Sequence, residues 1–271
     1  MAFNLRKTVS QLRRYGKVRP SFVAERLQNL MLELRNPHSV LATLSIRPKA
    51  VRSVRVSSNS TGTAWDDVAG AARERGISVT IGRPKQQQSK RRETERMGAG
   101  MARVEPPSPV PPGNLWKNLP AEGNGLWLAL DHVQDPQNLG AIFRLAGFFN
   151  VRGILMTKDR SAPVNATVCD VAVGGVEHVP FSVVPNLTQA FKKAQKSDIW
   201  VVGTCERSKE SVRDVPRDRH WMLVMGNEGD GMRRLTRESC DSLVALSAVG
   251  PVPSLNVAAA TAACLTVLSA Q

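Results

Sequence analysis

The sequence has few of the residues that metal centres and disulfide frameworks need. It contains four cysteines in 271 residues, and no two of them form a Cys-x-x-Cys pair. Its four histidines are equally scattered, so no metal site is expected. The cysteines are predicted to be free thiols in a reducing compartment, which favours a cytoplasmic location.

The chain also lacks long apolar runs. No stretch of about twenty apolar residues is present, so no membrane span is predicted. The first residues are polar and basic and lack the apolar core of a secretory signal. A chain of 271 residues is long enough for one large domain or for two modest ones, each with its own core.

The excess positive charge lies entirely in the first part of the chain. Residues 1–120 contain 22 lysines and arginines but 8 acidic residues, whereas residues 121–271 contain 15 of each kind. This separation favours a polyanion-binding module joined to a neutral catalytic body. The alternative is a basic surface that serves only solubility.

Composition and periodicity divide the chain into four segments. Residues 1–36 are expected to be a basic extension that ends in an amphipathic helix, which Asn36-Pro37 stops. Residues 37–104 alternate between helical and strand patterns and form a small α/β unit. Residues 105–122, with five prolines between positions 106 and 112, are expected to be a stiff linker. Residues 123–271 form the largest domain.

In this last segment, short apolar runs alternate with amphipathic ones. Strands are expected at 126–131, 151–156, 199–204, 221–226 and 242–246, and helices at about 138–149, 164–173, 186–196, 232–240 and 254–269. Apolar strands without polar alternation, separated by helices, are typical of a parallel sheet that is covered on both faces. The predicted fold class is therefore α/β, with a Rossmann-like parallel sheet.

Polar groups cluster where two of these elements begin or end. The glycines of Gly226–Met232 follow an apolar strand and allow backbone to approach a ligand closely. Glu228 within this run is left at the carboxyl edge of the sheet, where open α/β folds place their sites. Ser254 and Asn256 precede the last helix, and we expect Ser254 to be its N-cap and Asn256 to lie in its first turn.

A third motif runs from Asp131 to Arg144, and the three motifs in this order resemble those of the SpoU (TrmH) branch of the SPOUT methyltransferases. Those enzymes transfer a methyl group from S-adenosylmethionine to a ribose 2′-hydroxyl in RNA. The resemblance covers residues 126–271. Within the branch, residues 226–241 and 158–167 are most similar to the bacterial enzymes that methylate a guanosine in 23S rRNA.

This resemblance implies several properties that the residue pattern alone does not show. It implies a trefoil knot in the C-terminal part, a homodimer and S-adenosylmethionine as cofactor. By position and size, residues 37–104 are similar to the small L30e-like RNA-binding domain that precedes the catalytic domain in related enzymes. The expected partner is RNA, with rRNA favoured over tRNA because of the basic N-terminal part.

The resemblance, together with the positions of the residues, assigns roles to nine residues. Arg144 is the catalytic arginine, acting either as a base or by positioning and electrostatic stabilisation. The resemblance places Ser254 near the reacting ribose and has Asn256 order the cofactor loop. From their positions, Asn138 can reach the strand edge, and Glu228 can orient Arg144 or Asn138 or hydrogen-bond the substrate. Cofactor contacts are expected from the backbone around Thr204, Gly226, Leu246 and Leu255.

Each assignment has a plainer structural interpretation. Arg144 could be a surface partner of Asp135, Glu228 a solvated loop residue, and Leu246 and Leu255 ordinary core. At the level of function, the alternatives are a tRNA ribose 2′-O-methyltransferase of the same family and an RNA-binding relative that has lost catalysis. A nicotinamide-dependent oxidoreductase is disfavoured, because no Gly-x-Gly-x-x-Gly follows the first strand.

Overall fold

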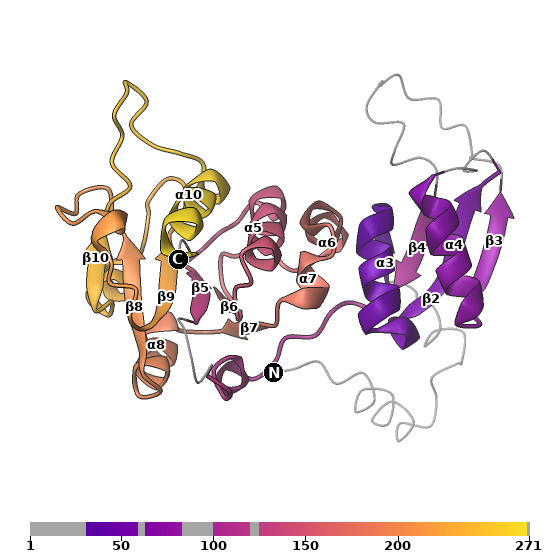
Figure 1. Ribbon diagram of the computed structural model, residues 1–271, viewed down its shortest axis with the longest axis horizontal. Coiled ribbons are helices and arrows are strands. Elements are labelled where there is room, and N and C mark those ends of the chain that lie inside the picture. The colour runs from indigo at the N-terminus through magenta and orange to yellow at the C-terminus, as the bar shows by residue number, and fades with distance from the viewer. Residues whose placement is uncertain (1–30, 59–62, 83–99, 120–124, 270–271) are drawn as a thin grey trace, which may run out of the picture. The chain divides into compact units, whose positions relative to one another are not determined.

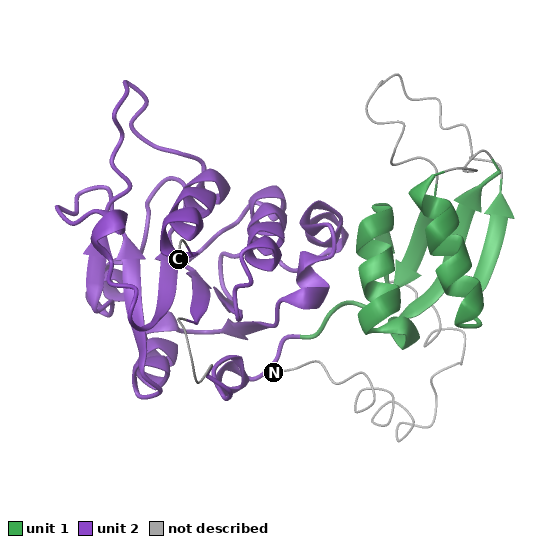
Figure 2. Ribbon diagram, in the orientation of Figure 1, with its two compact units in different colours: residues 1–108 green, residues 109–271 purple. Residues whose placement is uncertain are grey.

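The computed structural model describes residues 31–58, 63–82, 100–119 and 125–269. The chain divides into two compact units, residues 1–108 and 109–271 (Figure 2). The division falls inside the segment predicted to be a linker. Within the described residues, no helix is both long and apolar enough to cross a membrane.

Among its described residues, the first unit contains a four-stranded sheet and two α-helices (Figure 1). Its strand order is β1-β4-β2-β3, where β2 and β3 are parallel and β4 is antiparallel to both neighbours. The bounds are β1 (Leu32–Leu34), α3 (Pro37–Ile46), η1 (Pro48–Ala50), β2 (Val51–Ser57), α4 (Ala64–Glu74), β3 (Ser78–Gly82) and β4 (Gly100–Val104). The side chains of Asn36 and Thr63 cap α3 and α4 by accepting hydrogen bonds from backbone N–H groups of the first turn.

Two differences from the sequence-based expectation occur in this unit. The end of the predicted N-terminal helix is strand β1, which pairs with β4 and buries Leu34; the rest of that helix lies outside the described residues. Strand β4 was not predicted. Strand β1 has three residues, too few for its periodicity to be distinguished from that of a helix.

The second unit is built on a parallel six-stranded sheet with the order β10-β8-β9-β5-β6-β7. The predicted parallel sheet is therefore confirmed, although β7 was missed. Its strands are β5 (Leu126–Leu130), β6 (Ile154–Thr157), β7 (Phe181–Val184), β8 (Ile199–Thr204), β9 (His220–Met225) and β10 (Ser242–Val244). Its helices are α5 (Pro136–Phe148), α6 (Ala166–Ala172), α7 (Gly175–His178), α8 (Leu187–Gln195), α9 (Arg234–Glu238) and α10 (Val257–Ser269), with short 3-10 turns η2 (Pro112–Leu115) and η3 (Val212–Asp214).

Helices cover both faces of this sheet, as its apolar strands require. One face packs against α8, whose Leu187 and Phe191 are fully buried in a shared core. The other carries α5, which contacts each of its neighbours α6, α7 and α10 (Figure 1). The chain runs outward from β5 through β6 to β7 and then returns to the opposite side of β5, so the topological switch point lies between β5 and β9.

Part of the predicted linker belongs to the second unit. The Val110 N–H donates a hydrogen bond to the Phe181 carbonyl at 2.8 Å. The Leu115 carbonyl accepts one from the Trp127 indole at 2.8 Å, and both Leu115 and Trp116 are buried. The interpretation of 105–122 as one stiff linker is therefore wrong beyond residue 109, because these two apolar side chains are buried against the sheet.

Candidate active site

The three motifs meet at the carboxyl edge of the second sheet. The motif that begins at Asp131 follows β5, and the glycine-rich motif follows β9, the strand next to it. The third motif immediately precedes α10, which packs beside α5. All three therefore lie at the topological switch point, where open parallel sheets form their ligand sites.

The glycine-rich turn is closed tightly on itself. The Asn227 N–H donates to the Gly231 carbonyl at 3.1 Å, and the Gly231 N–H donates back to the Asn227 carbonyl at 3.0 Å. Gly231 has φ +66°, a conformation that favours glycine. A β-carbon on Gly226 would overlap the backbone of Gly231 and Met232. Glycine at these two positions lets the turn fold back and leaves Glu228 exposed at its tip.

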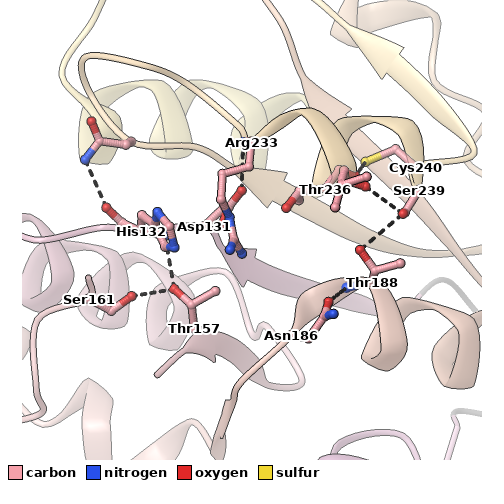
Figure 3. A network of polar contacts seen from close by, with 12 residues as sticks. Asp131, His132, Thr157, Ser161, Asn186, Thr188, Arg233, Thr236, Ser239 and Cys240 are labelled. Atoms are coloured by element: carbon pink, nitrogen blue, oxygen red, sulfur yellow. Dashed lines mark hydrogen bonds and ion pairs between the residues drawn. The ribbon is translucent and has the colours of Figure 1, made fainter. Parts of the chain in front are cut away.

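An ion pair between the buried Asp131 carboxylate and the exposed Arg233 ties this turn to β5 (Figure 3). The Asp131 carboxylate is completely buried and accepts hydrogen bonds from the Arg233 N–H at 2.9 Å and from its Nε at 2.8 Å. The Asn227 side-chain amide donates to the His132 carbonyl at 2.9 Å. We did not assign roles to these residues from the sequence. The sequence did contain one indication of this pair: Asp131 directly follows an apolar strand, and a carboxylate that is buried there needs a charged or hydrogen-bonding partner.

A chain of side-chain amides joins the three motifs directly. The Asn138 Nδ2 donates to the Glu228 Oε1 at 2.6 Å, and the Asn256 Nδ2 donates to the Asn138 Oδ1 at 2.7 Å. The Asn256 Oδ1 in turn accepts from the N–H groups of Ala258 at 2.8 Å and Ala259 at 3.3 Å. Three of the predicted catalytic residues therefore form one connected network.

Groups at its two ends fix the direction of this network. An ionised Glu228 carboxylate can only accept, and the backbone N–H groups at the start of α10 can only donate. Both amides between them must therefore point their oxygens toward α10 and their nitrogens toward Glu228. The network positions the carboxylate through two rigid elements, α5 and α10.

Asn256, rather than Ser254, caps the last helix. Helix α10 begins at Val257, and the Asn256 side chain accepts from its first turn. The expectation that Ser254 is the N-cap and Asn256 a first-turn residue was wrong. Both residue types are good caps, so the position of the first helical residue decides between them. Ser254 is exposed and lines a neighbouring cavity.

This cavity has a volume of about 640 Å³ and lies beside the glycine-rich turn. Its lining includes all four residues predicted to contact the cofactor, together with Glu228: Thr204, Gly226, Leu246 and Leu255. The Thr204 hydroxyl donates to the Val224 carbonyl at 3.0 Å. Leu246 and Leu255 are 36% and 55% exposed, so the alternative that they are ordinary core is wrong.

The cavity wall also includes residues that sequence reasoning did not identify. Exposed apolar side chains come from the segment between β10 and α10, among them Val249 and Val252. Arg207, from the loop after β8, and Arg237, from helix α9, also line the cavity. Cys264 contributes from α10, and burial raises the pKa of its thiol to about 11. These residues belong to no sequence motif; only the folding of the chain brings their segments together.

Arg144 lies on α5 but is not part of the cavity wall. Its side chain is exposed, and within the described part of the chain no hydrogen bond or ion pair reaches it. The alternative that Arg144 pairs with Asp135 is wrong, because the Asp135 carboxylate caps α5 by accepting from the Gln137 N–H at 2.9 Å. Of the five predicted catalytic residues, Arg144 is the one that neither joins the amide network nor lines the cavity.

The family of this chain follows from comparison with known proteins. The model of the SpoU rRNA methylase family matches residues 125–266. The chain belongs to the SpoU rRNA methylase family. The resemblance inferred from the three motifs is confirmed.

Relatives within the SpoU family include 23S rRNA (guanosine-2′-O-)-methyltransferases named RlmB. The protein from Pseudomonas aeruginosa is 38% identical over 235 residues, which are 84% of this chain and 92% of that protein. The protein from Bordetella pertussis is 46% identical over 144 residues, which cover 53% of this chain and 59% of that protein. For the Bordetella relative, the match thus spans less than two thirds of its length.

Solved structures of methyltransferases have the same fold. The methyltransferase AviRb from Streptomyces viridochromogenes superposes with a TM-score of 0.73 at 20% identity, covering 91% of each chain. A Sinorhizobium meliloti rRNA methyltransferase solved with bound AdoMet gives a TM-score of 0.69 at 21% identity, covering 90% of this chain and 88% of that one. At this level of identity the likeness establishes the fold class.

Proposed function

We propose that this SpoU-family protein transfers a methyl group from S-adenosylmethionine to a ribose 2′-hydroxyl in RNA, and that its substrate is a guanosine of 23S rRNA. The observation that carries the proposal is the convergence of three motifs on one cavity. Asn138, Glu228 and Asn256 form a single network, and Glu228 also lines the cavity. The RlmB relatives support the choice of 23S rRNA and guanosine.

The cavity suits S-adenosylmethionine in size and chemistry. A volume of about 640 Å³ is within the range of small-molecule sites, and its wall combines apolar side chains with backbone groups near Gly226 and Leu246. When bound, the cofactor supplies an electrophilic methyl group. Leu246 and Leu255 would hold the adenosine moiety in an apolar slot, while the turn at Gly226 brings backbone N–H and C=O groups close enough to hydrogen-bond it.

The protein residues then have to position the ribose hydroxyl and stabilise its developing negative charge. The Glu228 carboxylate, oriented by Asn138 and exposed to solvent, can accept a hydrogen bond from a ribose hydroxyl and pass its proton to water as the methyl group is transferred. Ser254, at the cavity wall, can hydrogen-bond the same ribose. A guanidinium keeps its proton, so we assign Arg144 to positioning and to electrostatic stabilisation of the oxyanion rather than to proton abstraction.

We further propose that the active form is a homodimer. Helix α10 has no charged residue in its sequence VAAATAACLTVLS, yet Ala259 and Thr266 on one side of it are exposed. A helix that is apolar all round is normally buried. On the neighbouring α5, Phe148 is 81% exposed. A second copy packed on this face would cover both helices.

In a homodimer, Arg144 of one subunit could act at the active site of the other. Arg144 shares the exposed side of α5 with Phe148 and has no role in its own cavity. We therefore propose that it acts at the site of the second copy. Heterodimers of Arg144→Ala and Glu228→Ala subunits test this. If Arg144 acts across the interface, one of the two sites is intact and activity returns; if it acts within its own subunit, both sites stay defective.

For the first unit, we propose that residues 37–104 are an L30e-like RNA-binding domain, as the charge excess of residues 1–120 suggests. The trefoil knot remains a prediction that rests on the family resemblance. All four cysteines are free, which is compatible with the cytoplasmic location predicted for the reaction.

Methyl transfer to separate RNA pools tests the proposed function. Radiolabelled S-adenosylmethionine is incubated with 16S rRNA, 23S rRNA or tRNA, using wild type, Arg144→Ala and the control Arg152→Ala, which removes another exposed arginine. We expect label in 23S rRNA as an alkali-resistant 2′-O-methyl dinucleotide, lost in Arg144→Ala and retained in the control. Label in tRNA alone would refute the rRNA assignment, and tight RNA binding without transfer to free RNA or ribosomal particles would indicate an inactive relative.

A further inference from the structure

One residue at the edge of the site adopts a backbone conformation that its side chain disfavours. His132, directly after strand β5, has φ +64°, in the left-handed region that glycine occupies freely. Residues with a β-carbon are uncommon there and are concentrated at functional sites. A glycine at this position would relieve the strain without altering the path of the chain. Because a glycine would fit this backbone better, we expect the imidazole side chain to have a function of its own.

The backbone of His132 is held from both sides (Figure 3). Its N–H donates to the Thr157 Oγ1 at 3.2 Å, and its carbonyl accepts from the Asn227 amide at 2.9 Å. The Thr157 hydroxyl is itself paired with the Ser161 hydroxyl at 2.6 Å. The loops after β5, β6 and β9 are thus tied together at this residue, which fixes the direction in which its imidazole projects.

The imidazole has no structural task in the described part of the chain. Its ring nitrogens make no hydrogen bond there, and the side chain is only partly buried. Burial and the nearby Arg233 lower the pKa of His132; Arg160 adds to this shift, while Asp131 and Asp159 oppose it. The ring is therefore neutral at physiological pH and offers one hydrogen-bond donor and one acceptor.

Arg160 is a second residue of the same kind on the adjacent loop. It has φ +51° and an exposed side chain, and no hydrogen bond or ion pair reaches it from the described residues. It follows β6, the strand beside β5, and its charge is close enough to affect His132. His132 and Arg160 thus lie on neighbouring loops, and both have a left-handed backbone conformation.

Neither residue lines the proposed cofactor cavity, although Asn227, which holds His132, does. We propose that His132 and Arg160 contact the substrate RNA next to the reacting ribose, with Arg160 pairing with a phosphate and the neutral imidazole hydrogen-bonding the adjacent nucleotide. This inference rests on the proposed function and adds two substrate-positioning residues to it. A cationic group and a neutral donor–acceptor side by side suit a nucleotide better than they suit either an apolar ligand or the cofactor sulfonium.

The test compares His132→Gly with Asp198→Gly. Asp198 also has a left-handed backbone, at φ +60°, but it precedes β8 at the opposite edge of the sheet. Both variants relieve the same kind of strain, so neither is expected to lower the melting temperature. We expect His132→Gly to raise the Kd and KM for 23S rRNA about tenfold, the effect of one lost hydrogen bond, with no change in the Kd of S-adenosylmethionine.

Two further variants define the chemistry. His132→Asn tolerates the left-handed backbone and keeps a donor and an acceptor, so we expect it to recover part of the RNA affinity. Arg160→Ala should weaken RNA binding at low salt and reduce the salt slope of the binding constant by about one. Arg152→Ala, which removes an exposed arginine at the other end of β6, serves as the matched control.

The outcomes separate this inference from the proposed function. Equal RNA affinity and KM for His132→Gly and Asp198→Gly would overturn the inference while wild-type methyl transfer still supported the function. If wild type transferred no methyl group, the function would fail, and the RNA-binding comparison would still decide the role of His132. A loss of S-adenosylmethionine affinity in His132→Gly equal to its loss of RNA affinity would also overturn the inference.

Discussion

Replacing Asn138 by aspartate places a carboxylate against Glu228. In the structure the Asn138 Nδ2 donates to the Glu228 Oε1 at 2.6 Å, while its oxygen accepts from Asn256. Asn138→Asp preserves the second contact, because a carboxylate oxygen can still accept. The first contact becomes a repulsion between two acceptors of the same charge. The substitution therefore breaks the network at one defined bond with almost no change in volume.

The magnitude follows from that one bond. Losing a hydrogen bond to a charged group costs about 1.5–3 kcal/mol. Repulsion between two unit charges 4 Å apart adds about 1 kcal/mol at the dielectric constant of water, which suits a site as exposed as Glu228. If the sum of these two free-energy costs raises the energy of the transition state, kcat/KM falls by roughly 10²- to 10³-fold. The loss should shrink at lower pH, where one of the two carboxyls takes up a proton.

Steady-state methyl transfer measured across pH tests this reasoning, with two companion variants. Gln137→Glu adds the same charge on the exposed side of the same helical turn and should leave activity within a few-fold of wild type. The double variant Asn138→Asp with Glu228→Gln restores a hydrogen bond of reversed direction and should recover part of the loss. If Gln137→Glu were as damaging as Asn138→Asp, the effect would be one of general charge and the network argument would be refuted.

Three other predictions concern the turn, pH and thiol chemistry. Gly226→Ala should lower both stability and S-adenosylmethionine affinity, measured by thermal unfolding with and without cofactor, because its β-carbon would overlap Gly231. The pKa of His132 is lowered in the folded state. The neutral imidazole therefore contributes stability above the ordinary pKa of 6.5, and this contribution is lost as the pH falls below 6.5. The melting temperature of wild type should drop more than that of His132→Gly between about pH 7.5 and 5.5. Cys205 lines the cavity, so it should react fastest with iodoacetamide and be protected by bound cofactor. Burial raises the pKa of the Cys240 thiol to about 12, which should keep this thiol unreactive. Equal labelling of both thiols would contradict this prediction.

Much of the second sheet could be predicted because its central strands are uninterrupted apolar runs. Strands β5 and β9 are buried on both faces, so their sequences carry a continuous apolar signal. Strand β7 was missed because four residues after Pro180 give too little pattern to distinguish a strand from a loop. In the predicted linker, the burial of Leu115 and Trp116 depends on a sheet whose strands lie further along the chain.

The site was predictable only in part, for a similar reason. Asn138 lies 90 residues before Glu228 and 118 residues before Asn256, so no local spacing relates it to either; only the family motifs did. The cap of α10 was assigned to Ser254 because two good cap residues stand close together, and the first helical residue is set by packing. The strain at His132 is a backbone property that no residue pattern reveals.

The most direct test of the account is the identity of the methylated product. 23S rRNA lacking 2′-O-methylation should be incubated with the full chain and labelled S-adenosylmethionine, digested to nucleosides, and compared with the same reaction using Asn138→Asp. The account predicts label in 2′-O-methylguanosine alone, reduced by roughly 10²-fold or more in initial rate by the variant. Label on a base, or a rate that Asn138→Asp leaves unchanged, would contradict it.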